Sequence, residues 1–222
     1  MNESSIENAI RAIEEAFVGV RLGDGISLRE ADVIDDYGSE SERAEARALD
    51  EKEDWRSIPD ELIERYPDVL CFMDESGLRF HLPAFMRFTL RRYEMSESRS
   101  IDSAIFRLCN PDAIETLRGN LTHAQNEAVH QFLARCKEIE DHSSTDASEI
   151  DLAIRQWQGD EAAARELKQI AENRSRWVEE IGALSLDLGV DWLTRYRNGE
   201  LDAKAEKRVS DLLCKLGGDP SA

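Results

Sequence analysis

The sequence predicts a mainly α-helical α+β protein, in which helices pack around one β-hairpin and an all-α module follows at the C-terminus. Three observations lead to this fold class. Capping boxes stand before runs of apolar residues spaced three and four apart, which is typical of amphipathic helices. Residues 69–82 contain two short apolar runs around a glycine-containing turn, a hairpin pattern. A polar run near residue 142 separates two helical blocks.

Two helices are expected in the first 38 residues. Ser4 and Glu7 form a capping box before a stripe of isoleucines, and a glycine-containing segment ends that helix. Ser27 and Glu30 form a second capping box, and the helix that they begin ends at Gly38. Because both boxes precede apolar residues at helical spacing, each start is predicted by two independent signals.

Two further helices precede the hairpin. Ser41 is expected to cap a helix that runs to Lys52 and contains mainly alanine and glutamate. Such a helix buries little, so Trp55 just beyond it is expected to anchor it. A short helix then lies between Pro59 and Pro67, since proline disfavours the helical conformation of the residue before it.

The hairpin is predicted from residues 69–93. Residues 69–73 and 78–82 are the expected strands, and Gly77 supplies the positive φ that a turn of this length needs. In the second strand, apolar residues alternate with Arg79 and His81. Pro83 suits the first turn of a helix, where its missing N–H has no intrahelical partner. We therefore expect strand, turn, strand and helix in that order.

The remaining chain is expected to be helical and to divide into two parts. Helical turns at 100–109 and a helix at 122–140, capped by Thr122 and Gln125, complete a domain at 1–141. Residues 142–148 form a polar linker. A helical module at 149–222 contains helices near 150–157, 167–188, 190–196 and 201–216, with a break near Asn173 left open. Its three tryptophans offer apolar surface either for a private core or for self-association of the C-terminal helices.

Charge limits the classes of partner. The net charge is −19, and residues 1–54 alone carry 16 acidic and 6 basic groups, a net of −10. Such a surface repels nucleic acid phosphates and anionic membranes, so we expect binding to neither. It favours attraction to a basic protein, although high charge also serves solubility alone.

Other patterns indicate where the protein works. The longest uninterrupted apolar run has five residues, too few to cross a bilayer, and the N-terminus lacks the basic and apolar regions of a secretory signal. A cytoplasmic location is therefore expected. The glycines fit neither a dinucleotide-binding nor a P-loop pattern, so no cofactor is expected.

The candidate partner or ligand surface has an acidic part. Asp32 and Asp36 share a helical face, with Asp35 beside them. Hard cations accept such oxygen ligands, yet no known ligand spacing is present, so no metal is expected. The alternatives are a solvated face or pairing with Arg29 and Arg43.

The second part of the candidate surface is basic. Arg87 and Arg91 share a helical face near Arg79 and His81, which are placed on the polar side of the hairpin. This region would bind an anion or an acidic peptide, unless the arginines pair with carboxylates of the same chain. No nucleophile motif accompanies the histidine, so catalysis is not favoured.

Two motifs resemble those of an uncharacterised bacterial family, a domain of unknown function. The first is Phe-His-Leu-Pro-Ala-Phe-Met at 80–86, and the second is the Leu-Thr-x-x-Gln-x-x-Ala-Val-x-x-Phe-Leu helix at 121–133. The segments at 22–28 and 34–37 are similar too. The resemblance covers residues 6–139 and implies a shared fold that ends near residue 140. It implies no activity, and His81 stands where tyrosine is more usual.

These observations favour a binding protein over an enzyme. The leading hypothesis is an acidic cytoplasmic protein, of the immunity or antitoxin type, that masks a basic partner such as a nuclease. The alternative is a small-molecule or anion-binding protein, or an enzyme, that uses the hairpin and the arginines. The alternative predicts a pocket between the hairpin and the helix that begins at Ser27.

Overall fold

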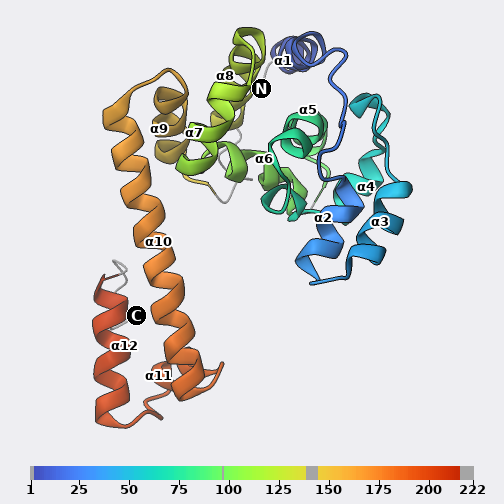
Figure 1. Ribbon diagram of the computed structural model, residues 1–222. Helices are drawn as coiled ribbons and strands as arrows, with labels where there is room; N and C mark the ends of the chain where they lie inside the picture. The colour runs from blue at the N-terminus through green and yellow to red at the C-terminus, as the bar shows by residue number, and fades with distance from the viewer. Residues whose placement is uncertain (1–2, 97, 139–144, 216–222) are drawn as a thin grey trace. The chain divides into compact units, whose positions relative to one another are not determined.

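The computed structural model describes the backbone of residues 3–96, 98–138 and 145–215, and within these ranges every regular element is helical (Figure 1). The chain divides into two compact units, with the boundary between Lys168 and Gln169. None of the described helices is both long enough and apolar enough to cross a membrane.

The first unit contains nine complete α-helices among its described residues and two short 3₁₀ helices. In chain order these are α1 (Glu3–Ala16), α2 (Leu28–Asp35), α3 (Glu40–Ala48), η1 (Trp55–Ser57), α4 (Asp60–Arg65), η2 (Val69–Cys71), α5 (Glu75–Arg92), α6 (Ser100–Leu108), α7 (Pro111–Asn120), α8 (His123–Cys136) and α9 (Ala147–Trp157). The unit also includes the first residues of α10 (Glu161–Leu188).

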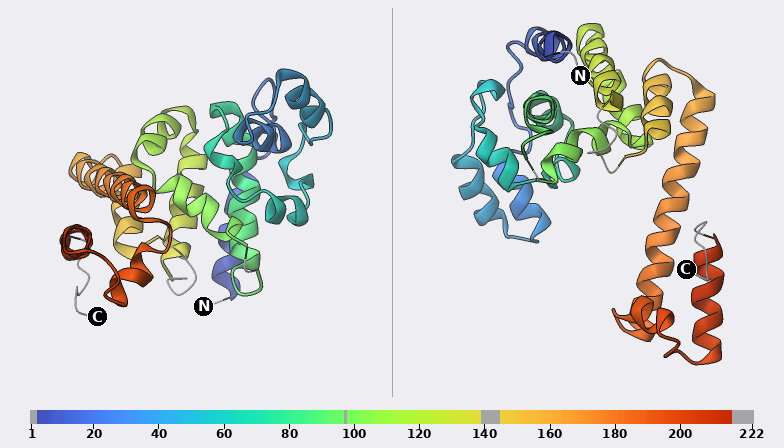
Figure 2. Two further views of the ribbon diagram at one scale, coloured as in Figure 1. Left: turned by 90° about the horizontal axis from the view of Figure 1, so that it is seen from below. Right: turned by 180° about the vertical axis from the view of Figure 1, so that it is seen from behind.

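Helix α5 is the centre of the first unit. It contacts α1, α4, α6, α7 and α8, and the views in Figure 2 show it enclosed by other helices. Every residue from Phe80 to Leu90 is buried, including those on opposite sides of the helix. A helix that is buried on all sides is the usual core element of a larger helical protein.

The predicted β-hairpin is wrong, and with it the α+β fold class: the described chain is all-α. Residues 69–71 form the 3₁₀ helix η2, and residues 78–82 lie within the first half of α5. Pro83 is in the interior of α5 rather than in its first turn. The alternation of Leu78, Phe80 and Leu82 comes from a helix with apolar residues on every face, where any short stretch resembles a strand.

The start of α5 explains why the segment is helical. The Asp74 carboxylate caps the helix by accepting the Gly77 N–H at 2.8 Å, and it also accepts the Ile26 N–H at 3.0 Å. Gly77 is required because the backbone at Ile26 passes close to it, and not because the chain turns there. A Cβ atom built there would lie 2.4 Å from the Ile26 carbonyl oxygen. The segment before α2 therefore packs directly on the first turn of α5.

Local signals placed several other helices correctly. At the start of α2, Glu30 accepts the Ser27 N–H, although the Ser27 hydroxyl has no partner among the described residues, and the Thr122–Gln125 box of α8 is complete. The cap of α3 is Ser39 rather than Ser41. Helix α7 was not predicted, although Asn110 caps it and Pro111 occupies its first position, an arrangement typical of a helix start.

The predicted domain boundary at 142–148 stays a prediction, because residues 139–144 lie outside the described residues. Beyond them, α9 contacts α7 and α8. The Trp157 indole donates a hydrogen bond of 3.0 Å to the Leu108 carbonyl oxygen, and the buried Ile150 and Ala153 complete this face. Helix α9 is therefore part of the core of the first unit.

The second unit is a small helical assembly. It contains the later part of α10, α11 (Trp192–Arg197) and α12 (Ala203–Lys215), and Figure 1 shows α12 beside α10. Its core cluster holds four buried side chains, Leu184, Trp192, Val209 and Leu212, with partly buried neighbours around them, and Ala205 is also buried. Helix α10 is continuous, without a break at Asn173.

Candidate functional site

The seven candidate residues lie on two elements of the first unit. Asp32 and Asp35 are on α2 and Asp36 is its C-cap, whereas Arg79, His81, Arg87 and Arg91 are all on α5. Without a hairpin, the last four do not converge on one polar surface.

Arg87 and Arg91 bind their own chain. The Arg87 guanidinium is nearly buried, donates to the Arg56 carbonyl oxygen at 3.1 Å and lies 5.1 Å from the centre of the Trp55 ring. Arg91 lies 3.5 Å from the Glu14 carboxylate, and Arg87 lies 3.9 Å from the same group. Arg87 therefore links α5 to both α1 and η1, and Arg91 links α5 to α1, as expected of intramolecular pairing.

Arg79 and His81 lie in different environments. Arg79 is exposed, whereas His81 has an exposed fraction of 0 %. The imidazole is thus in the core rather than on a polar face.

A buried carboxylate joins α2 to α3. Glu30 accepts the Ser27 N–H at 3.2 Å, and its two oxygens lie 3.1 Å from Arg43 and 3.1 Å from Arg47. Burial alone would raise the pKa of Glu30, but these hydrogen bonds outweigh burial and lower it, so the carboxylate stays ionised. Both arginines of α3 are thereby directed inward.

A second ion pair involves Arg29, the arginine of α2. The Arg29 guanidinium lies 2.6 Å from Asp50, whose side chain is only 4 % exposed, and the Arg29 N–H donates to the other oxygen of Asp50 at 2.7 Å. Asp50 follows α3, so this pair closes the same two helices from the other end. Every arginine of α2 and α3 is therefore engaged by one of two partly or fully buried acids, Glu30 and Asp50.

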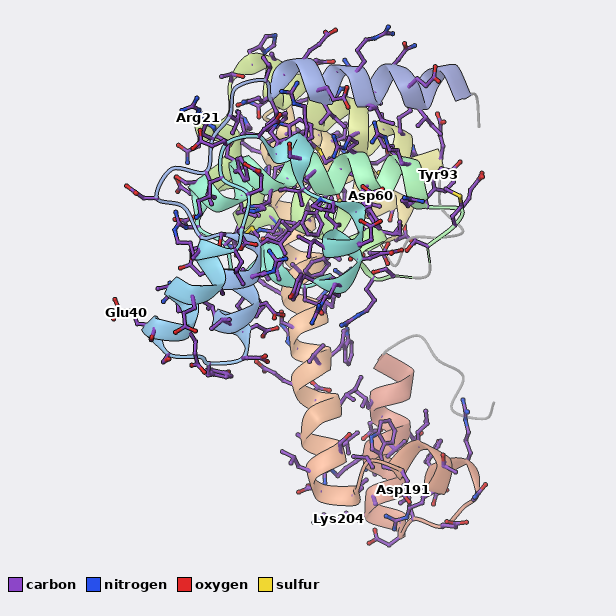
Figure 3. The ribbon with its side chains drawn as sticks, turned by 90° about the vertical axis from the view of Figure 1, so that its right-hand side faces the viewer. Arg21, Glu40, Asp60, Tyr93, Asp191 and Lys204 are labelled. Atoms are coloured by element: carbon purple, nitrogen blue, oxygen red, sulfur yellow. The ribbon has the colours of Figure 1, made fainter. Side chains whose placement is uncertain are left out.

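The outer acids of these helices are left without basic partners. Within the described residues, no lysine or arginine pairs with four exposed acids, which we name the acidic face: Asp35, Asp36, Glu40 and Glu45. Figure 3 shows Glu40 at the start of α3, directed away from the rest of the unit. Burial raises the pKa of the neighbouring Asp32, and the carboxylates of Asp36 and Asp35 raise it further. Unneutralised negative charge thus accumulates here.

Tyr37 stands in the middle of the acidic face. Its side chain is 97 % exposed and its φ is +56°, the left-handed region that normally holds glycine or asparagine. The Tyr37 N–H donates to the Ile34 carbonyl oxygen at 3.1 Å, and the Gly38 N–H donates to the Val33 carbonyl oxygen at 2.8 Å. These two bonds form a Schellman motif, so the strained conformation ends α2 and presents an aromatic ring to solvent.

A pocket of about 370 Å³ lies among α2, the residues after α3, α4 and α5. Its apolar lining is Leu28, Leu49, Ile58, Pro59 and Leu62, and its polar lining is Arg29, Asp50, Glu51 and His81. It occupies the position that the small-molecule hypothesis requires, between α2 and the segment that contains His81. Arg79 and the three candidate aspartates do not line it.

The candidate site was thus only partly visible in the sequence. Asp35 and Asp36 are exposed and Asp32 is half-buried, and the sequence shows that these three acids are neighbours on a helix. Glu30 and Asp50 were missed as partners of the arginines, because those pairings join residues 13 to 21 apart. Tyr37 was missed because tyrosine is not a residue that usually occupies the left-handed position at a helix end. Among the described residues, no group of three or more acidic, histidine or cysteine side chains is arranged to hold a metal ion.

Comparison with known proteins identifies the family but no activity. A family model described as a family of unknown function, DUF6714, matches residues 5–161, so the chain belongs to that family. No curated protein matches the chain, and no solved structure matches it. The matched range runs from α1 through α9 and ends at the first residue of α10.

Proposed function

We propose that this member of a family of unknown function binds a basic protein through the acidic face and Tyr37. A concrete form of the proposal is an immunity or antitoxin-like protein that masks a basic nuclease or other toxin. The observation that carries it is the inward pairing of Arg29, Arg43 and Arg47, which leaves the outer acids of α2 and α3 uncompensated.

The physical argument has two parts. Clustered carboxylates attract a basic partner from a distance and exclude acidic competitors, so they raise the association rate and specificity. A buried aromatic anchor supplies the affinity that charge alone does not, and tyrosine is enriched at such positions. Tyr37 is held in a costly backbone conformation with its ring in water, an arrangement that contributes nothing to the core.

The test is a pull-down from an extract of the native host at moderate salt, with three versions of the protein as bait. The first is the native protein, and the second carries Asp35→Asn, Asp36→Asn and Glu40→Gln. The third is a control that removes the same charge from exposed acids elsewhere in the first unit, through Glu7→Gln, Glu15→Gln and Glu115→Gln. Bound proteins are identified and quantified by mass spectrometry.

We expect one stoichiometric basic protein on the native and control baits and at least a tenfold loss on the second bait. With the purified pair, the association rate should fall steeply as salt rises, whereas the dissociation rate should change little. Equal capture by all three baits, or the absence of any basic protein, would contradict the proposal.

The alternative function, anion binding in the arginine region, has less support. Arg87 is nearly buried and is engaged by Arg56 and Trp55, so its guanidinium is not presented to a ligand. Arg91 is exposed, but it lies 3.5 Å from the Glu14 carboxylate, which competes with any anion. The small-molecule form of the alternative has one specific observation in its favour, the pocket that His81 lines.

A further inference from the structure

The polar groups that line the 370 Å³ pocket differ in how well they are satisfied. Arg29 and Asp50 bind each other through the 2.6 Å ion pair. One oxygen of Glu51 accepts the N–H groups of residues 52, 53 and 54 at 2.7 to 3.1 Å, and the hydrogen bonds from residues 53 and 54 lower the pKa of Glu51. Both carboxylates therefore already have their donors.

His81 is the exception. Its Nδ1 lies 2.8 Å from the Gly77 carbonyl oxygen, and because a carbonyl only accepts, Nδ1 must carry the proton. Burial lowers the pKa of His81 to about 4, so the ring is neutral near pH 7 and Nε2 holds a lone pair. Nε2 is buried and has no hydrogen-bond partner among the described residues. No other lining residue has a buried polar atom in this condition.

The chemistry of the pocket selects its ligand. Five apolar side chains line the space, and Arg29 neutralises the Asp50 carboxylate, whereas the Glu51 carboxylate repels anions. Among the lining residues, Nε2 of His81 is the single buried acceptor without a partner. A buried acceptor without a partner favours any group that donates a hydrogen bond to it. A volume of this size matches a small molecule rather than a peptide.

We propose that this pocket binds a small neutral molecule with an apolar body and one hydroxyl or N–H group, which donates a hydrogen bond to Nε2 of His81. Leu49 and Pro59 are exposed and stand at the outside of the pocket, whereas His81 is fully covered. Because Nε2 is covered in this structure, the donor reaches it only when side chains that line the pocket move. The site is independent of the proposed partner surface, since no residue of the acidic face lines it.

The experiment compares two probes of equal size, phenol and toluene, which differ only in the hydroxyl group. Each is titrated into the full chain, and the ¹⁵N resonance of His81 Nε2 and the melting temperature are followed. We expect phenol to move the Nε2 resonance in the direction of hydrogen bonding and to raise the melting temperature more than toluene does at the same concentration.

Two variants identify the site. His81→Phe removes the acceptor at nearly constant size, and phenol should then lose its advantage over toluene. His123→Phe changes an exposed histidine of α8 and should leave that advantage intact. If the His81→Phe variant does not fold, the response of the Nε2 resonance of the native chain to phenol and toluene still tests the proposal. Equal effects of the two probes, phenol binding without a change at Nε2, or no binding by either would overturn the proposal.

Discussion

At the scale of single residues, two side chains adopt states that cost free energy. Tyr37 places a bulky side chain in the left-handed region, and His81 places an unsatisfied nitrogen in the core. An unpartnered buried polar atom typically costs about 1–3 kcal/mol, and a left-handed residue other than glycine about 1–2 kcal/mol. The Tyr37 ring is 97 % exposed and Nε2 of His81 has no partner among the described residues, so both groups point to binding rather than to stability.

Replacing Tyr37 with glycine should stabilise the protein and abolish partner binding. Glycine adopts the left-handed conformation without steric cost, so we expect the free energy of unfolding to rise by about 1 kcal/mol. Tyr37→Phe keeps both the ring and the strain and should leave stability unchanged. Urea unfolding measures both variants, and a Tyr37→Gly variant less stable than the native chain would show that the conformation is not strained.

Acid should destabilise the protein through His81. Its pKa is about 4 in the folded state, against an ordinary value of 6.5. Below pH 6.5 the unfolded chain therefore binds a proton that the folded chain does not, and stability falls as pH decreases towards 4. Between pH 7.5 and 5 this group alone should remove about 2 kcal/mol.

Comparison with His81→Phe isolates that contribution. The variant lacks the titrating group, and any packing cost of the larger ring is the same at each pH. The stability difference between the two proteins should thus change by about 2 kcal/mol over this range in urea unfolding. Parallel pH profiles would indicate that His81 is accessible to protons in the folded state.

At the scale of elements, the fold depends on how the segment before α2 lies against the start of α5. Asp74 binds both the first turn of α5 and the Ile26 N–H, and Gly25 and Gly77 allow the two backbones to approach. A Cβ atom at Gly25 would lie 2.6 Å from the Gly77 nitrogen. This contact fixes where α2 begins. It thereby also positions the α2 residues that line the pocket together with His81.

Substituting alanine at two helical glycines should have opposite effects. Gly77→Ala should destabilise by about 2 kcal/mol, because the methyl group meets the Ile26 backbone, which has little freedom to move. Gly119→Ala in α7 meets nothing within 4 Å and should stabilise by up to about 1 kcal/mol. Thermal unfolding measures both. A neutral or stabilising Gly77→Ala would mean that the two segments are not in contact.

At the scale of the whole molecule, the two units differ in how much they bury. Most of the described core lies in the first unit, and the described residues of the second unit contribute five buried apolar side chains. Small units with few buried residues are only marginally stable by themselves. We therefore expect the first unit to carry the cooperative unfolding of the protein.

A fragment that ends at Lys168 should fold alone. It keeps Ala163 and Leu167, which are buried, and its melting temperature should lie within a few degrees of that of the main transition of the full chain. A fragment that ends at residue 141 loses α9, with Trp157 and Ile150, and should be strongly destabilised. Circular dichroism on heating compares them. A stable 141-residue fragment would show that α9 is dispensable.

The sequence by itself determined the features that depend on neighbours within about four residues. Glu30 accepts the Ser27 N–H, and Thr122 and Gln125 bond each other reciprocally, so hydrogen bonds between residues three apart mark the starts of α2 and α8. The excess of acid in the first 54 residues is likewise a property of composition. The family resemblance, too, rests on motifs read directly along the chain, and the match over residues 5–161 confirms it.

Only the tertiary structure decided the secondary structure at 69–82 and the chemistry of the sites. A helix buried on every side carries no amphipathic period, so the sequence of α5 does not distinguish it from a strand. The pairing of Arg29 with Asp50 and the orphaned nitrogen of His81 likewise depend on side chains that are remote in sequence. Packing decides which acids face outward without a basic partner and which nitrogen lacks a hydrogen-bond partner. The reason is that every charged or polar group competes for partners across the whole folded unit.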